Sequence, residues 1–147
     1  MNAVFVDTGG WMACADGADP AHASCGSARD GALEAGRTLI TTDFVIDETL
    51  TLIRFRLGLN AANAWWHQID GRARLRWERI ESDRFERARH LFFQYRDNDL
   101  SFTDCTSIAV MRELKLTTVI TTDRHFQQVG FTLLPGWGTQ KRRQRRS

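Results

Sequence analysis

Short apolar runs alternate with amphipathic stretches along the chain, and this alternation predicts an α/β fold. Short apolar or β-branched runs at residues 3–6, 38–41, 117–121 and 131–134 are typical of buried strands, and a further short strand is expected to begin at Leu75-Arg76-Trp77. Between them, apolar residues recur at helical spacing and predict helices over 21–35, 44–57, 59–70, 82–95 and from 102 onward. Strands that alternate with helices in this way favour a parallel sheet.

Residues with strong capping preferences mark the ends of several helices. Asp43 is the expected N-cap of the helix over 44–57, and Ser82 is expected to cap the helix that runs to Tyr95. Ser101 and Asp104 form a capping-box pattern, with Asp where Glu or Gln is more usual. The expected helix stops are Gly36, Gly58 and Gly71, and the expected core residues of the helix after Ser82 are Phe85, Ala88, Leu91 and Phe92.

Three aspartates lie next to predicted strands and helices at the same end of the expected sheet. Asp7 directly follows the first strand, which we expect at the centre of the sheet. Asp123 follows the strand over 117–121, and Asp104 lies in the first turn of its helix. In open parallel sheets, the carboxyl ends of the strands form one rim where ligands bind. We therefore expect the three carboxylates to converge there.

Glu48 is the fourth candidate, about one turn into the helix that follows Asp43. We prefer Glu48 to Asp47 because its neighbours three and four positions away are largely apolar, so it is expected to point inward. Each candidate also has a structural explanation, because Asp7 and Asp104 could cap helices and Glu48 suits the positive end of the helix dipole.

Taken together, the four carboxylates predict a divalent metal site. Crowded carboxylates repel one another, and a bound cation removes that cost. Oxygen ligands without His or Cys select Mg²⁺ or Mn²⁺ over zinc. The four histidines and three cysteines of the chain show no zinc-ligand spacing. A metal site of this kind can activate water for attack on a phosphodiester.

Composition indicates one globular domain with a basic tail. Hydrophobic residues make up 42% of the 147 residues and charged residues 26%. The net charge is +2, but residues 1–140 hold 15 basic against 18 acidic residues, a net charge of −3. We expect a domain over residues 1–135 and a tail over 136–147. The tail arginines that are candidates for RNA binding are Arg142, Arg143, Arg145 and Arg146, although a solvated, disordered end is the favoured explanation for them.

No apolar stretch reaches membrane-spanning length, so no membrane association is expected. The odd number of cysteines favours reduced thiols and a cytoplasmic location. Trp65 and Trp66 are adjacent, so one helix face cannot bury both. We expect one in the core and the other on a surface that a partner covers. The arginines near the third strand, Arg72, Arg74, Arg76 and Arg79, could contact phosphate or lie on a solvated face.

Four segments resemble the acidic motifs of PIN-domain ribonucleases, and in particular of VapC-like toxins. They are Val4-Phe5-Val6-Asp7-Thr8, Thr41–Thr51 around Glu48, Ser101-Phe102-Thr103-Asp104-Cys105 and Thr121-Thr122-Asp123-Arg124-His125-Phe126. The resemblance spans about residues 3–134. By this match Asp7, Glu48, Asp104 and Asp123 correspond to the acidic quartet of the family, and Thr8 to its usual Ser or Thr.

The resemblance implies a three-layer sandwich, with a mostly parallel sheet between helices. It also implies Mg²⁺- or Mn²⁺-dependent cleavage of RNA, a homodimer, and inhibition by a cognate antitoxin protein. Other readings are a PIN ribonuclease in RNA processing and a non-catalytic RNA- or protein-binding module. Phosphoryl transfer on a doubly wound fold is less favoured, because Arg124 and His125 stand where such sites usually carry a lysine.

Overall fold

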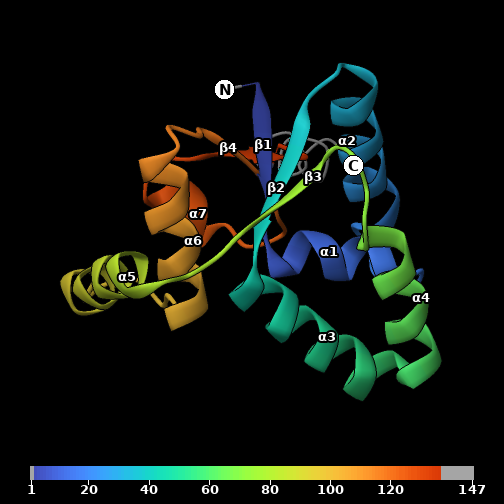
Figure 1. The fold of residues 1–147 in the computed structure, drawn as a ribbon, viewed down its shortest axis with the longest axis horizontal. Helices are drawn as coiled ribbons and strands as arrows, with labels where there is room; N and C mark the ends of the chain where they lie inside the picture. The colour runs from blue at the N-terminus through green and yellow to red at the C-terminus, as the bar shows by residue number, and fades with distance from the viewer. Residues whose placement is uncertain (1, 137–147) are drawn as a thin grey trace, which may run out of the picture.

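The computed structural model describes residues 2–136, which form a parallel sheet with helices on both sides (Figure 1). The strands are β1 (Ala3–Val6), β2 (Thr38–Thr42), β3 (Leu75–Glu78), β4 (Thr118–Ile120) and β5 (Thr132–Leu134). The helices are α1 (Thr8–Ala15), α2 (His22–Glu34), α3 (Asp43–Leu57), α4 (Leu59–Ile69), α5 (Ser82–Gln94), α6 (Phe102–Glu113) and α7 (His125–Gln128). The predicted tail arginines lie outside the described residues.

The sheet order is β3-β2-β1-β4-β5, and every neighbouring pair is parallel. The expected central position of the first strand is therefore confirmed. In Figure 1, α5, α6 and α7 lie on one side of the central strands, and α1, α2 and α4 lie on the other. The predicted three-layer α/β sandwich is confirmed. Because the strands are parallel, the residues that follow β1 and β4 lie at the same rim.

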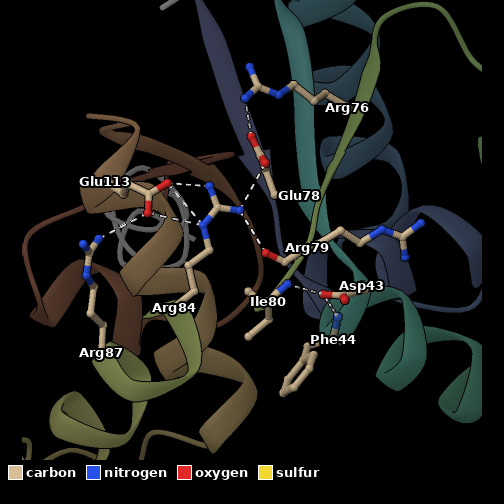
Figure 2. Close-up of polar contacts among 9 residues, drawn as sticks. All are labelled: Asp43, Phe44, Arg76, Glu78, Arg79, Ile80, Arg84, Arg87 and Glu113. Carbon is tan, nitrogen blue, oxygen red and sulfur yellow. Dashed lines mark hydrogen bonds and ion pairs between the residues drawn. The ribbon is translucent and has the colours of Figure 1, made fainter. Parts of the chain in front are cut away.

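The start of α3 differs from the prediction by one residue. Thr42, the last residue of β2, is the N-cap, and its hydroxyl accepts a hydrogen bond from the Val45 amide at 3.1 Å. Asp43 is the first helical residue instead. Its carboxylate accepts from the amides of Phe44 and Ile80, each at 3.0 Å, and ties the segment after β3 to α3 (Figure 2). Since Thr42 stays extended to pair with Glu78, the cap falls on it.

The start and the packing of α5 also differ from the prediction. Glu81, not Ser82, occupies the N-cap position, and it makes no side-chain cap. Ala88 is fully buried, but Phe85 and Phe92 are 42% and 40% exposed. The helix packs chiefly on α6 and lies outside the sheet, so only one narrow stripe of it is covered. Both phenylalanines contact the ring of Phe102 at the edge of this packing.

The adjacent tryptophans differ in burial, as expected, and each packs on another tryptophan. Trp65 is buried and packs edge-on against Trp11, with ring centroids 5.7 Å apart. Trp66 is half-buried and packs in the same way on Trp77 of β3, at 5.4 Å. Trp77 of β3 therefore covers part of the Trp66 ring and leaves the rest of it exposed.

Figure 2 shows how Arg84 fastens α5 to its neighbours. Its guanidinium contacts the Glu78 carboxylate at 3.1 Å, pairs with Glu113 of α6, and donates to the Arg79 carbonyl at 3.0 Å. Arg76 pairs with Glu78 at 2.5 Å, and the Arg79 guanidinium lies over the Trp77 ring, 5.8 Å from its centroid. Two of the arginines considered for phosphate binding thus have structural contacts.

Within residues 2–136 no helix is long and apolar enough to cross a membrane. The three cysteines are free thiols, as expected.

Gly10 allows α1 to lie directly against the end of β4. A Cβ at this position would stand 2.3 Å from the Ile120 carbonyl oxygen and 2.9 Å from its carbon. Backbone atoms cannot give way as a flexible side chain can, so Gly10→Ala should separate α1 from β4. Gly31 of α2 offers a matched control, because nothing lies within 4 Å of a Cβ built there.

We expect Gly10→Ala to lower the free energy of unfolding by at least ~3 kcal/mol, which is in the range of severe core overpacking. Gly31→Ala should raise it by about 0.5–1 kcal/mol through better helix propensity. Urea denaturation followed by circular dichroism measures both. Equal effects of the two substitutions would contradict the close approach.

Candidate active site

Asp7 occupies the centre of the rim, between β1 and α1. Its side chain is only 3% exposed, and it stands at the N-cap position without capping the helix. One carboxylate oxygen, Oδ2, accepts a hydrogen bond from the Thr121 hydroxyl at 3.2 Å. The other, Oδ1, is buried and has no partner within the described residues. The helix-cap explanation for Asp7 is therefore wrong, and an acceptor oxygen is left available.

Thr121 joins two of the candidate carboxylates, although the sequence reasoning did not single it out. Its buried hydroxyl donates to Asp7 and accepts from the Asp123 amide at 3.0 Å. Asp123 in turn accepts from the His125 amide at 2.9 Å and contacts the His125 ring Nδ1 at 2.6 Å. The signal in the sequence was a Thr two residues before Asp at a strand end, where a hydroxyl readily bonds nearby backbone.

Asp104 is held by the predicted capping box at the start of α6. Its Oδ2 accepts from the Ser101 amide, and its own amide donates to the Ser101 hydroxyl, both at 3.0 Å. The structural and functional interpretations of Asp104 are thus compatible, because the cap uses one carboxylate oxygen and leaves the other unused. The side chain is 8% exposed.

Glu48 and Thr8 complete the predicted set. Glu48 is half-buried on α3 and interacts electrostatically with Asp7 and Asp104, whereas Asp47 is exposed. Glu48 therefore points inward toward the other carboxylates, as expected, and Asp47 points to solvent. The hydroxyl of Thr8 is buried without a partner in the described part of the chain. A second unpartnered hydroxyl, on Ser107, lies one turn after Asp104.

The electrostatics of the rim show that the four carboxylates are close enough to repel one another. Burial, and then the charge of Asp104, raise the pKa of Asp7 to about 8, with smaller increases from Asp123 and Glu48, whereas the backbone amide of Thr8 opposes this increase. Burial also raises the pKa of Asp104 to about 6, with Asp123 and Glu48 adding to it. The hydrogen bonds from Ser101 oppose this increase. No cationic side chain of the described residues is among the groups that act on Asp7 and Asp104, so the negative charge of these carboxylates is not balanced by a protein cation.

The donor set fits a hard divalent cation. It contains carboxylate and hydroxyl oxygens, including the unpartnered Oδ1 of Asp7 and the hydroxyl of Thr8. Within residues 2–136, no group of three or more His, Cys, Asp or Glu side chains is already arranged closely enough to hold a metal ion by itself. An ion with few protein ligands that keeps several waters, as Mg²⁺ does, suits such an open arrangement. The residues therefore fit Mg²⁺ or Mn²⁺.

The raised pKa of Asp7 predicts that the metal-free protein loses stability as pH rises. The folded state keeps a proton that the unfolded chain releases above its pKa near 4, so the contribution is full below that pH and is lost as pH rises toward 8. The slope from one such proton approaches ~1.4 kcal/mol per pH unit. Asp7→Asn should flatten the dependence of melting temperature on pH between 5 and 8 in EDTA.

Asp47→Asn is the matched control, because it removes an exposed carboxylate from the same rim region. It should leave the pH dependence of the wild type unchanged. If the melting temperatures of wild type and Asp7→Asn depended on pH in the same way, the raised pKa of the buried Asp7 carboxyl group would be contradicted.

Comparison with known proteins identifies the family. Residues 4–132 match the model of the PIN domain. The 23S rRNA-specific endonuclease VapC20 of Mycobacterium tuberculosis is 31% identical over 128 residues, which cover 87% of this chain and 95% of that protein. Ribonuclease VapC26 of Mycobacterium tuberculosis is 26% identical over 141 residues, which cover 90% of this chain and 100% of that protein.

The fold comparison agrees with the sequence comparison. The crystal structure of Mycobacterium tuberculosis VapC20, described as a Sarcin-Ricin loop cleaving toxin, matches with a TM-score of 0.78 at 30% identity. The match covers 88% of this chain and 96% of the VapC20 chain. Sequence and fold thus agree that this chain belongs to the PIN-domain family and is a VapC-like ribonuclease.

Proposed function

We propose that this chain is a divalent-metal-dependent endoribonuclease and the toxin of a toxin–antitoxin pair. The observation that carries the proposal is the buried and unpartnered Oδ1 of Asp7, near which Asp104, Asp123 and Glu48 lie closely enough for their charges to raise the pKa of Asp7. Carboxylates crowded together destabilise the fold unless a cation neutralises them, so packing alone gives no reason for this arrangement, whereas a cation site does. The VapC20 and VapC26 relatives, which are an endonuclease and a ribonuclease, support RNA hydrolysis.

The four carboxylates would hold Mg²⁺ or Mn²⁺, with the hydroxyl of Thr8 beside Asp7. When bound, the ion supplies positive charge against the scissile phosphate and lowers the pKa of water for attack on phosphorus. Asp7 contributes its unpartnered oxygen, and Thr121 keeps that carboxylate in one orientation. Asp104 is fixed by its capping box, so the start of α6 holds a carboxylate at a constant position. Asp123 is oriented by His125.

A structured ribosomal RNA is the substrate we propose to test first. The VapC20 relative is named as specific for 23S rRNA, and its solved structure is described as that of a Sarcin-Ricin loop cleaving toxin. The two chains align over nearly the whole length of that protein.

We also propose a homodimer and a cognate antitoxin as partners. Phe92 and Phe93 of α5 are 40% and 66% exposed, and their rings contact each other. Phe92 also contacts the ring of Phe102, which in turn contacts Phe85. An aromatic surface of this kind supports an interface. Light scattering that gives a single chain per particle, for wild type and Phe93→Ser alike, would contradict the dimer.

The purified protein should cleave ribosomal RNA with Mg²⁺ or Mn²⁺ and lose this activity in EDTA. Asp7→Asn and Asp104→Asn should each lower kcat/KM on the order of 10²-fold or more, as expected for loss of one electrostatic stabiliser. Asparagine at position 104 keeps an acceptor for the Ser101 amide, so the cap survives. Asp47→Asn serves as the control, and undiminished cleavage in EDTA would refute the metal-dependent mechanism.

Thr121→Val tests whether the hydroxyl that joins Asp7 and Asp123 matters to the reaction. The substitution keeps the shape of the side chain but leaves Asp7 without its hydrogen bond. We expect activity and Mn²⁺ affinity to fall on the order of 10-fold, the range seen for groups that orient metal ligands. Thr121→Ser should restore both.

Thr132→Val, on the exposed side of β5, is the matched control and should behave as wild type. A Thr121→Ser protein as impaired as Thr121→Val would show that the methyl packing of Thr121, and not its hydroxyl, is what matters.

A further inference from the structure

A cleft of about 600 Å³ lies between α2, α4 and the turn that leads into β3. None of the four rim carboxylates lines it. Its size falls within the usual range of small-molecule sites. It is therefore a concave surface that the proposed ribonuclease site does not use.

The floor of the cleft is apolar. It is formed by the side chains of Trp11, Leu33, Leu39, Trp65, Ile69 and Leu75. The two indole rings meet edge to face. Trp11 Nε1 donates to the Thr41 hydroxyl, whereas Trp65 Nε1 is buried out of reach of solvent and has no hydrogen-bond partner within the described residues. The floor can thus bury a flat or apolar group but cannot hydrogen-bond it through these rings.

The outer edge of the cleft is cationic. Arg72 and Arg74 line it from the turn before β3, and Arg29 lines it from α2. Asp30 is the one acidic residue among the lining residues, and it pairs with Arg29 at 3.0 Å. Arg74 donates to the Leu33 carbonyl at 3.3 Å, which holds its guanidinium beside the cleft. Within residues 2–136 the side chain of Arg72 has no hydrogen bond or ion pair, so its donors remain available.

The apolar floor and the cationic edge together match a ligand that has an anionic group and a flat apolar body. Guanidinium groups match phosphate oxygens with paired donors, and indole and leucine walls suit a nucleobase. A purely apolar ligand would leave the arginines without a counter-charge, and inorganic phosphate would leave the floor unfilled. We propose that this cleft binds a small phosphate-bearing ligand of the nucleoside monophosphate class, with the phosphate on Arg72 and Arg74 and the base over the apolar floor.

The proposal does not depend on the proposed function, because the cleft and the rim share no residue. Titration with 5′-nucleoside monophosphates in EDTA, followed by calorimetry, tests it without any contribution from metal at the rim. We expect saturable binding with a dissociation constant on the order of 10–100 μM, in line with the size of the ligand. The matching nucleosides and inorganic phosphate should each bind about 10-fold more weakly or worse.

Arg72→Gln and Arg74→Gln should each weaken nucleotide binding about 10-fold, the value of a charge-assisted hydrogen bond. Arg96→Gln is the matched control, because it removes the same charge from an exposed loop between α5 and α6 and should change binding less than about twofold. Asp104→Asn should leave binding unchanged even where it abolishes RNA cleavage.

Ala73→Trp fills the cleft from an exposed position and should abolish binding without lowering the melting temperature. The proposal is overturned if the wild type shows no saturable binding or if Arg96→Gln weakens it as much as Arg72→Gln. It is equally overturned if Ala73→Trp binds as wild type does, or if only oligonucleotides and no mononucleotide saturate the protein.

Discussion

The amino end of α1 lies directly against the carboxyl end of β4, and the geometry of the site depends on this contact. The Asp7 amide donates to the Ile120 carbonyl at 3.1 Å, and Gly10 has no Cβ to keep the two backbones apart. This approach seals Asp7 from water and places its carboxylate on the Thr121 hydroxyl. A looser contact would let Asp7 reach solvent and act as an ordinary helix cap.

The rim is a place where local preferences and global stability oppose each other. Burial favours the neutral form of Asp7 and Asp104, whereas the capping box of Asp104 favours the charged form. Unpartnered buried oxygens on Asp7 and Thr8 add a further cost. Such conflicts are expected at functional sites, because a preformed cation site is unfavourable until the cation binds. The fully buried side chains of β1 and β4 provide the packing that tolerates this cost.

The arginines in and around β3 have different structural roles, although they lie close together in the sequence. Arg84 links β3, α5 and α6 through two carboxylates, so it is a structural residue (Figure 2). Arg79 covers a tryptophan ring. Arg72 and Arg74, a few residues earlier, line a cleft on the other side of β3.

The sequence by itself determined the strands, the helices, the parallel sheet and the four rim carboxylates, because these follow from local periodicity and from where strands end. It also determined the capping box of Ser101 and Asp104, which needs only neighbours three residues apart. Only the tertiary structure decided that Thr121 would join Asp7 to Asp123, since the contact spans 114 positions. Likewise, the cover of Trp66 by Trp77, the partial exposure of Phe85 and Phe92, and the shift of the α3 cap to Thr42 depend on how β3 and α5 dock. Periodicity marks which face of an element is apolar, but the partner that covers that face is chosen by packing between distant segments.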